Sequence, residues 1–171
     1  MLRALYHLFF WPRVRHDRAM KTFASKIPSG ARVLEVGSGK PVGGRYPYSA
    51  ARYFEHCDFL LSDVEPRFGH RVLDISDPPL DESFDVVIVS SVLEHVYEYE
   101  AAIAGIRSLL REGGLARIRV PFLFPLHDEP NDYWRFTQHA LLRMFDDFRI
   151  VKIKHEGFRR APLGYVALVT K

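Results

Sequence analysis

The segment ARVLEVGSG, residues 31–39, leads a short β-branched and aliphatic stretch directly into two closely spaced glycines. Such a stretch favours a β-strand, and the glycines permit a tight turn that other residues adopt poorly. A second segment, FDVVIVSS at residues 84–91, is apolar over most of its length. Continuous apolar runs are typical of parallel strands that are buried on both faces. A sheet with buried parallel strands is therefore expected.

The rest of the chain alternates strand-like and helix-like segments. Residues 98–114 place Ile103, Ile106 and Leu110 on one helical face ahead of a glycine stop. Residues 156–163 separate the last two strand-like segments and are typical of a hairpin. This order predicts an α/β fold with a mostly parallel sheet, helices on both faces and a C-terminal antiparallel hairpin. The other expected strands are residues 58–63, 70–75, 115–122, 148–155 and 164–171, and the other expected helices are residues 48–57, residues 137–145 and the stretch around Met20, Phe23 and Ile27.

Composition narrows the class of protein. The chain has 171 residues, a net charge of +3 and one cysteine, Cys57. A single cysteine excludes an intrachain disulfide and a cysteine-based zinc site, and it favours a reducing, cytoplasmic location. The arginines are scattered rather than gathered in one run, which argues against a nucleic-acid partner.

The N-terminal end differs from the rest of the chain. Its first residues, MLRALYHLFFWP, are apolar and are followed by several arginines, but the stretch is too short to span a bilayer. We expect residues 1–30 to form a helical segment that packs on or over a single domain at residues 31–171. Two alternatives stay open for residues 1–18, namely peripheral contact with the inner face of a membrane and contact within an oligomer.

The glycine turn and the acids near it limit the ligand. A dinucleotide-binding turn would need glycine at position 42, where this chain has Val42. A P-loop would need serine or threonine at position 41, where it has Pro41, so both kinds of nucleotide site are disfavoured. Acids stand instead at Glu35, Asp63 and Asp74, in or directly after the expected strands. Carboxylates repel phosphate, whereas they suit a cationic ligand with ribose hydroxyls and an exocyclic amine. S-Adenosylmethionine has these groups and no phosphate.

Four segments in order, VLEVGSG, LSD, VLDISDPPLDESFDVVIVSSVLEHV and LLREGG, resemble the class I S-adenosylmethionine-dependent methyltransferases over residues 31–170. The resemblance implies a Rossmann-like fold, methyl transfer, and S-adenosyl-L-methionine as the cofactor. It implies that the glycine turn contacts the methionine part, that the acid ending the second strand holds the ribose, and that residues after the third and fourth strands surround the adenine. The implied cofactor-binding residues are Glu35, Gly37, Ser38, Gly39, Asp63, Val64, Asp74, Ile75, Ser90 and Ser91.

The stretch VPFLFPLHDEPNDYWRFT, residues 120–137, follows the fifth expected strand, where an acceptor must approach the methyl group. It resembles a subset of these methyltransferases whose members often accompany sugar and polysaccharide assembly. The resemblance implies O-methylation of a glycan or small metabolite. His127 is the expected base, oriented by Asp128 or Asp132, and His95 is the second candidate.

Other interpretations of this stretch stay open. The stretch could be purely structural, with Arg135 and Asp132 forming an ion pair within the loop and the aromatic side chains packing against the core. Four potential metal ligands occur there, but their spacing matches no standard pattern, so no metal is expected. The functional alternative is a noncatalytic relative that binds the cofactor or a partner without turnover. The aromatic residues are Tyr133, Trp134 and Phe136, and the potential ligands are His127, Asp128, Glu129 and Asp132.

Overall fold

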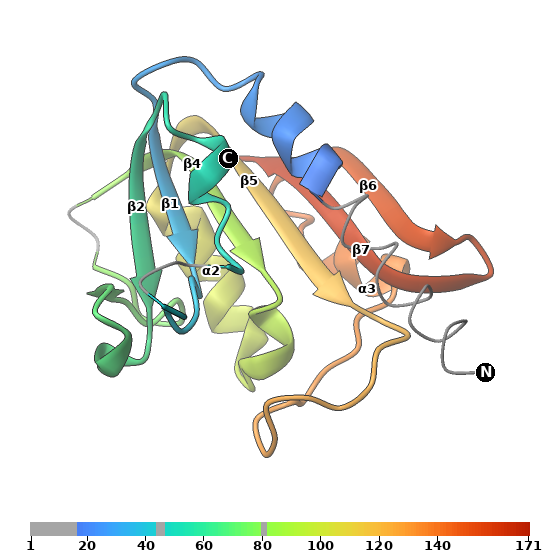
Figure 1. Cartoon of the computed structure of the whole chain (residues 1–171). Coiled ribbons are helices and arrows are strands. Elements are labelled where there is room, and N and C mark those ends of the chain that lie inside the picture. Colours follow the sequence, from blue (N-terminus) through green and yellow to red (C-terminus); the bar gives the residue numbers. More distant parts are fainter. Residues whose placement is uncertain (1–16, 44–46, 80–81) are drawn as a thin grey trace.

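The computed structural model describes residues 17–43, 47–79 and 82–171, and its centre is a seven-stranded sheet in the order β3-β2-β1-β4-β5-β7-β6 (Figure 1). Strands β1 to β5 are parallel to one another, and β7 is antiparallel to both β5 and β6. The strands are β1 (Arg32–Val36), β2 (Asp58–Asp63), β3 (Arg71–Val72), β4 (Phe84–Ser90), β5 (Leu110–Pro121), β6 (Arg149–Phe158) and β7 (Ala161–Thr170). The helices are α2 (Tyr99–Leu109) and α3 (Gln138–Met144), with 3-10 turns η1 (Ala51–Tyr53), η2 (Pro66–Phe68) and η3 (Leu93–His95).

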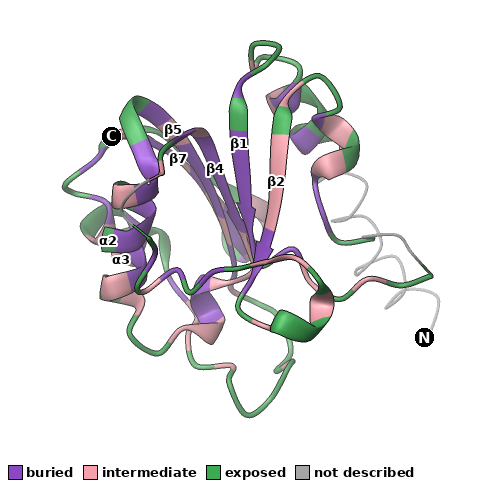
Figure 2. Cartoon of the chain, turned by 90° about the vertical axis from the view of Figure 1, so that its left-hand side faces the viewer, coloured by how far each residue is buried: buried purple, intermediate pink, exposed green. Residues whose placement is uncertain are grey.

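Helices cover both faces of the sheet, as the sequence predicts. Successive residues of β4 point to opposite faces, so Val87 packs in one core cluster and Ile88 in the other. Helices α2 and α3 contribute to the larger cluster, whereas the helical residues 17–24 and η1 contribute to the smaller one. Figure 2 shows β1 and β4 mostly buried between these layers, which is why their sequences are apolar on both faces.

The strand order places a binding edge at the middle of the sheet. β1 pairs with β2 on one side and with β4 on the other, so the chain leaves β1 toward one flank and returns to the opposite flank. In open parallel sheets, ligands bind outside the carboxyl ends of the strands at such a reversal point. The loops after β1, β2 and β4 are therefore the expected ligand-binding loops.

Two local expectations are wrong. The helix expected at residues 48–57 is only the 3-10 turn η1, which is followed by a turn that leads into β2. The glycine stop expected after α2 is also absent, because the helix ends at Leu109 and β5 begins at Leu110. Gly113 has φ of 73° and continues within this extended strand, where the register against β4 shifts between Phe84 and Val86. Gly113 and Gly114 therefore lie at an irregularity in the pairing of β5 with β4, and they do not end the helix.

The connection between β2 and β3 is short, as the spacing of the sequence requires. It contains the 3-10 turn η2 instead of a full crossover helix. Glu65 caps this turn by accepting a hydrogen bond from the amide of Arg67. The flank of the sheet beside β2 consequently carries little helical cover.

Part of the N-terminal segment lies within the described residues. Residues 17–24 are helical, and Met20 and Ala24 are buried against the sheet. The apolar stretch before them, with its expected membrane or oligomer contact at residues 1–18, falls almost wholly outside the described residues. Among residues 17–43, 47–79 and 82–171, no helix is both long and apolar enough to cross a membrane.

Candidate active site

The turn after β1 is held open by two glycines with positive φ, at 71° for Gly37 and 75° for Gly39. L-amino acids with a Cβ rarely adopt this conformation, so the sequence needs glycine at both positions. A Cβ on Gly37 would also collide with Val92, which follows β4. At both glycines, the turn therefore exposes main-chain atoms and no side chain at the carboxyl edge of the sheet.

The side chain of Glu35 is buried and does not face the solvent. Its carboxylate accepts hydrogen bonds from the hydroxyl of Ser49 and from the amide of Ala50, the latter at 2.8 Å. Burial raises the pKa of Glu35, and these hydrogen bonds oppose the shift. Ser38 is also buried, and its amide donates to the carbonyl of Ser62 at 2.9 Å. Both residues shape the turn that the resemblance assigned to the methionine part.

Asp63 joins the turn to the end of β2. Its Oδ2 accepts a hydrogen bond from the amide of Gly39 at 2.9 Å, and its Oδ1 accepts from the amide of Glu65 at 3.0 Å. The side chain is nearly buried, but it also lines a cavity at the edge of the sheet. A carboxylate fixed by two backbone amides is well placed to accept further hydrogen bonds from ligand hydroxyls.

The cavity has a volume of about 310 Å³ and lies at the ends of β1, β2 and β4. This is the lower bound of the usual size for small-ligand pockets. Its lining includes Asp74 and Ile75 from the region after β3, and also His95 and Asn131. Of the predicted cofactor residues, five line the cavity: Gly37, Asp63, Val64, Asp74 and Ile75.

The two serines at the end of β4, Ser90 and Ser91, lie elsewhere. Ser90 has a buried hydroxyl without a hydrogen-bond partner among the described residues, and Ser91 has φ of 56°. The Ser91 hydroxyl accepts a hydrogen bond from Nη1 of Arg119 at 2.9 Å. Neither serine lines the cavity, so the structure does not bring them to the predicted cofactor pocket.

A second cavity, of about 380 Å³, lies at the opposite end of the strands. Its lining includes Asp85 and Arg111, which form an ion pair with each other. Because it sits at the amino ends of β1 and β4, it is not at the edge where parallel sheets bind ligands. We therefore place the site at the carboxyl edge.

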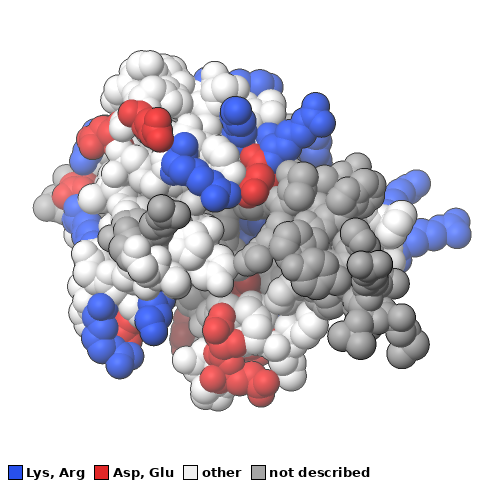
Figure 3. Space-filling model, viewed as in Figure 1, with Lys and Arg blue, Asp and Glu red and all other residues white. Residues whose placement is uncertain are grey.

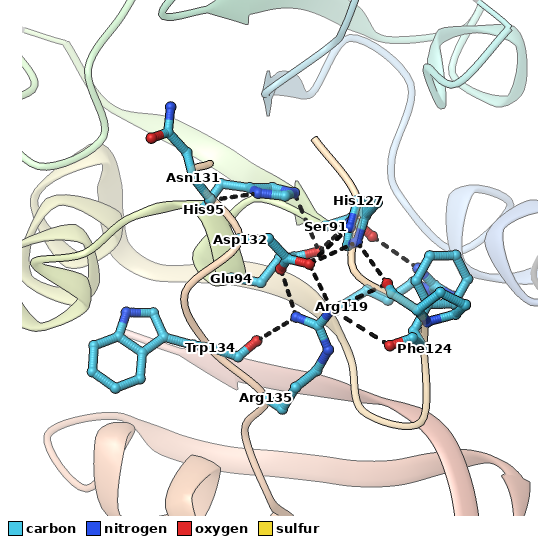
Figure 4. A network of polar contacts seen from close by, with 11 residues as sticks. Ser91, Glu94, His95, Arg119, Phe124, His127, Asn131, Asp132, Trp134 and Arg135 are labelled. Atoms are coloured by element: carbon cyan, nitrogen blue, oxygen red, sulfur yellow. Dashed lines mark hydrogen bonds and ion pairs between the residues drawn. The ribbon is translucent and has the colours of Figure 1, made fainter. Parts of the chain in front are cut away.

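The loop after β5 is ordered by one aspartate (Figure 4). Asp132 accepts hydrogen bonds from both terminal nitrogens of Arg135, at 2.6 and 2.7 Å, and from the amide of His127 at 3.0 Å. The Arg135 guanidinium holds the pKa of Asp132 well below its usual value. The same carboxylate lies 3.2 Å from Nδ1 of His127. Asp132 therefore orients the imidazole that the sequence predicts as the base.

Asp128 does not take part in this arrangement. It is exposed, it has φ of 52°, and among the described residues no ion pair joins it to His127. Of the two acids that the sequence left open as orienting residues, the structure selects Asp132. The pairing of Arg135 with Asp132 is also present, and Trp134 and Phe136 pack against the core while Tyr133 stays largely exposed.

Sequence reasoning missed Glu94, which lies beneath both candidate histidines (Figure 4). Its side chain is fully buried, and neither carboxylate oxygen has a hydrogen-bond partner among the described residues. Oε1 lies 3.8 Å from Nε2 of His127 and 4.0 Å from Nε2 of His95. Burial raises the pKa of Glu94 to about 7, although the positive charges of Arg119 and Arg135 oppose the shift.

The signal for Glu94 in the sequence is weak. The residue lies in LEHV directly after β4, beside His95, but an acid in a loop is ordinarily solvated. What buries it is the loop after β5, since the carbonyl of Glu94 accepts hydrogen bonds from the amides of Tyr133 and Trp134. Only the fold brings these two segments together.

Charged side chains of both signs are spread over the visible face in Figure 3. Acidic side chains lie at its upper left as well as at its lower edge, so they mark no single end of the sheet. The view shows no continuous basic track for nucleic acid.

Comparison with known proteins identifies the family. The family model described as "Methyltransferase domain" matches residues 11–154. Among curated proteins, a hybrid PKS-NRPS synthetase, iliA of Neonectria sp. (strain DH2), is 27% identical over 48% of this chain. The match covers only 2% of that much longer protein.

Solved structures agree with the family model. The N-methyltransferase NodS from Bradyrhizobium japonicum WM9, in complex with S-adenosyl-L-homocysteine, superimposes with a TM-score of 0.68 at 16% identity, covering 94% of this chain and 87% of NodS. The CurJ carbon methyltransferase superimposes with a TM-score of 0.61 at 16% identity, covering 85% of this chain and 50% of CurJ. These likenesses confirm the Rossmann-like fold expected from the sequence. The chain belongs to the methyltransferase-domain family.

Proposed function

We propose that this chain transfers a methyl group from S-adenosylmethionine to an oxygen atom of a glycan or small metabolite. The observation that carries the proposal is the cavity at the carboxyl edge of the sheet. Gly37 of the glycine turn, the acids Asp63 and Asp74, and His95 all line it. A site for a cationic nucleoside thus shares one residue, His95, with the histidine cluster.

The residues present fit this cofactor. Asp63 already accepts hydrogen bonds from two backbone amides, and it is positioned to accept others from ribose hydroxyls. Asp74 and Ile75 offer a carboxylate and an apolar wall on the adenine side. Gly37 lines the same cavity with backbone alone, beside the acids that suit the positive charge of the methionine part. When bound, the cofactor supplies an electrophilic methyl group, so the chain need only position and activate the acceptor.

The acceptor side is the cluster of Glu94, His95 and His127. Nδ1 of His127 faces Asp132 and the carbonyl of Pro125, at 3.2 Å each, so Nε2 is the nitrogen left for the acceptor. A hydroxyl that approaches here can pass its proton to Nε2 while its oxygen bonds to the methyl carbon. The printed names of NodS and CurJ specify nitrogen and carbon acceptors, so the fold alone does not choose the atom. The imidazole base is what favours oxygen in this chain.

The proposal is tested by incubating the full chain with methyl-labelled S-adenosylmethionine and a panel of sugars, nucleotide sugars and hydroxylated metabolites. We expect a labelled methyl ether, and we expect a strongly reduced rate for His127→Ala, with His139→Ala as a matched control. His139 is exposed on α3. A labelled product that carries its methyl group on nitrogen or carbon would overturn the oxygen assignment.

A further inference from the structure

Three potential metal ligands converge next to the cofactor cavity. One carboxylate oxygen of Glu94 and one ring nitrogen each of His95 and His127 all lie within 4.8 Å of one another. Two imidazoles and one carboxylate are a ligand set used for divalent zinc and for iron. Zinc bonds of about 2.1 Å place tetrahedral ligand atoms about 3.4 Å apart, so the side chains need to close by about an ångström.

The Nδ1 atoms of both imidazoles already contact oxygen atoms of the loop after β5. Nδ1 of His95 lies 2.9 Å from the carbonyl of Asn131, and Nδ1 of His127 lies 3.2 Å from both the carbonyl of Pro125 and a carboxylate oxygen of Asp132. Metal-binding histidines characteristically donate their second N–H to a carbonyl or carboxylate. These contacts leave both Nε2 atoms directed toward Glu94, as Figure 4 shows.

The charges around the cluster leave one negative charge without a partner. Arg135 forms an ion pair with Asp132, and Arg119 forms one with Glu156 at 2.8 Å. The carboxylate of Glu94 is fully buried and makes no hydrogen bond among the described residues. A buried carboxylate without a partner is costly and must be neutralised by a proton or by a cation. The two imidazole nitrogens beside it favour a metal cation over an arginine or lysine.

We propose that Glu94, His95 and His127 bind one divalent transition-metal ion of the zinc class, whose open coordination position faces the acceptor side of the cofactor cavity. His95 lines that cavity, which puts the ion at its rim. Two imidazole ligands disfavour Mg²⁺ and Ca²⁺, which prefer oxygen. Asp132 is not a ligand, because Arg135 occupies both of its oxygens.

This inference rests on the proposed function and refines its acceptor side. With the ion bound, Nε2 of His127 is a ligand and no longer takes the proton. The ion instead binds the acceptor hydroxyl and lowers its pKa, so that the proton passes to water before the oxygen bonds to the methyl carbon. The carbon–sulfur bond breaks in the same step, and S-adenosylhomocysteine leaves.

The test titrates the chelator-treated full chain with Zn²⁺ by calorimetry and with Co²⁺ by visible absorption. We expect one ion per chain in the wild type. In Glu94→Gln and His127→Asn we expect binding to weaken by at least about tenfold, as loss of a ligand or its support does. His139→Asn serves as the control for surface histidines, and its affinity should equal that of the wild type. Neither Glu94 nor His127 lines the cofactor cavity.

S-Adenosylmethionine binding, measured on the same preparations, separates the two proposals. Retained cofactor binding in both variants shows that they are folded, and it makes their loss of metal specific to the cluster. If the wild type binds cofactor but no ion, or if both variants bind the ion as well as the wild type does, the metal site is wrong and the methyltransferase proposal stands. If the wild type binds the ion but no cofactor, the methyltransferase proposal fails instead.

Discussion

At the scale of single residues, the two glycines of the turn after β1 differ in their surroundings. Both have positive φ, so alanine at either position costs roughly 1–2 kcal/mol of backbone strain. A Cβ on Gly37 also collides with Val92, whereas a Cβ on Gly39 meets nothing within 4 Å. We expect Gly37→Ala to lose more stability and more cofactor affinity than Gly39→Ala, as measured by urea unfolding and calorimetry. Equal losses in the two variants would show that the contact with Val92 is unimportant.

Glu35 makes a second prediction at this scale, for the dependence of stability on pH. Burial raises its pKa in the folded protein, so the folded state holds a proton that the unfolded chain releases above the usual glutamate value. Stability from this group is present below about pH 4.5 and falls as pH rises through the folded pKa. In Glu35→Gln this fall should disappear, because glutamine does not ionise.

The measurement is urea unfolding of the wild type and Glu35→Gln at several values between about pH 4 and pH 8. Glu94 titrates in the same direction, so the informative quantity is the difference in unfolding free energy between the two proteins. We expect that difference to shift in favour of the variant as pH rises. Parallel curves would mean that Glu35 has the same pKa in the folded and unfolded chains.

Single residues also show where sequence reasoning reached the site and where it stopped. Asp63, an acid that ends a strand near the glycine turn, lines the cavity at the edge of the sheet, where the resemblance led us to expect it. Glu94 was missed because its burial comes from Tyr133 and Trp134, which lie far along the chain. The choice between Asp128 and Asp132 likewise required the backbone conformation of the loop, which composition does not encode.

At the scale of elements, α2 shapes the cofactor cavity without lining it. A Cβ on Gly105, in the middle of this helix, would collide with the carbonyl oxygen of Ile75. Ile75 belongs to the cavity wall on the adenine side. We therefore expect Gly105→Ala to weaken S-adenosylmethionine binding even though alanine favours the helix.

The matched control for this element is Ala104→Gly, on the exposed side of the same helix. It should cost about 1 kcal/mol of stability through helix propensity and leave cofactor affinity unchanged. Calorimetry and urea unfolding of both variants separate the two effects. Tighter or unchanged cofactor binding in Gly105→Ala would contradict a role for this close approach.

The elements themselves were predicted unevenly. Strands with apolar runs, such as β4, were identified because burial on both faces leaves a clear pattern. The segment that became η1 was expected to be a longer helix, and the glycines after α2 were expected to end it. Both errors arose where tertiary packing, rather than local preference, set the boundary.

At the scale of the whole molecule, the order of acids, glycines and apolar runs along the chain was sufficient to predict the family and the fold class. The sequence predicted parallel central strands and a final hairpin but no strand order, which the structure supplies. The acceptor side could not be predicted in the same way. It is formed by the end of β4 and the loop after β5, and their contact exists only in the folded sheet.

The central claim is that the carboxyl edge of this sheet binds S-adenosylmethionine. Calorimetric titration of the folded wild type beside Asp63→Ala tests it most directly. Asp63 is fixed by the amides of Gly39 and Glu65, so its loss removes both a ligand contact and the support of the turn. We predict one cofactor per chain, with affinity at least about tenfold weaker in the variant, the loss expected when a charged hydrogen bond is removed. A folded wild type that binds no S-adenosylmethionine, or a variant that binds it equally well, would contradict the claim.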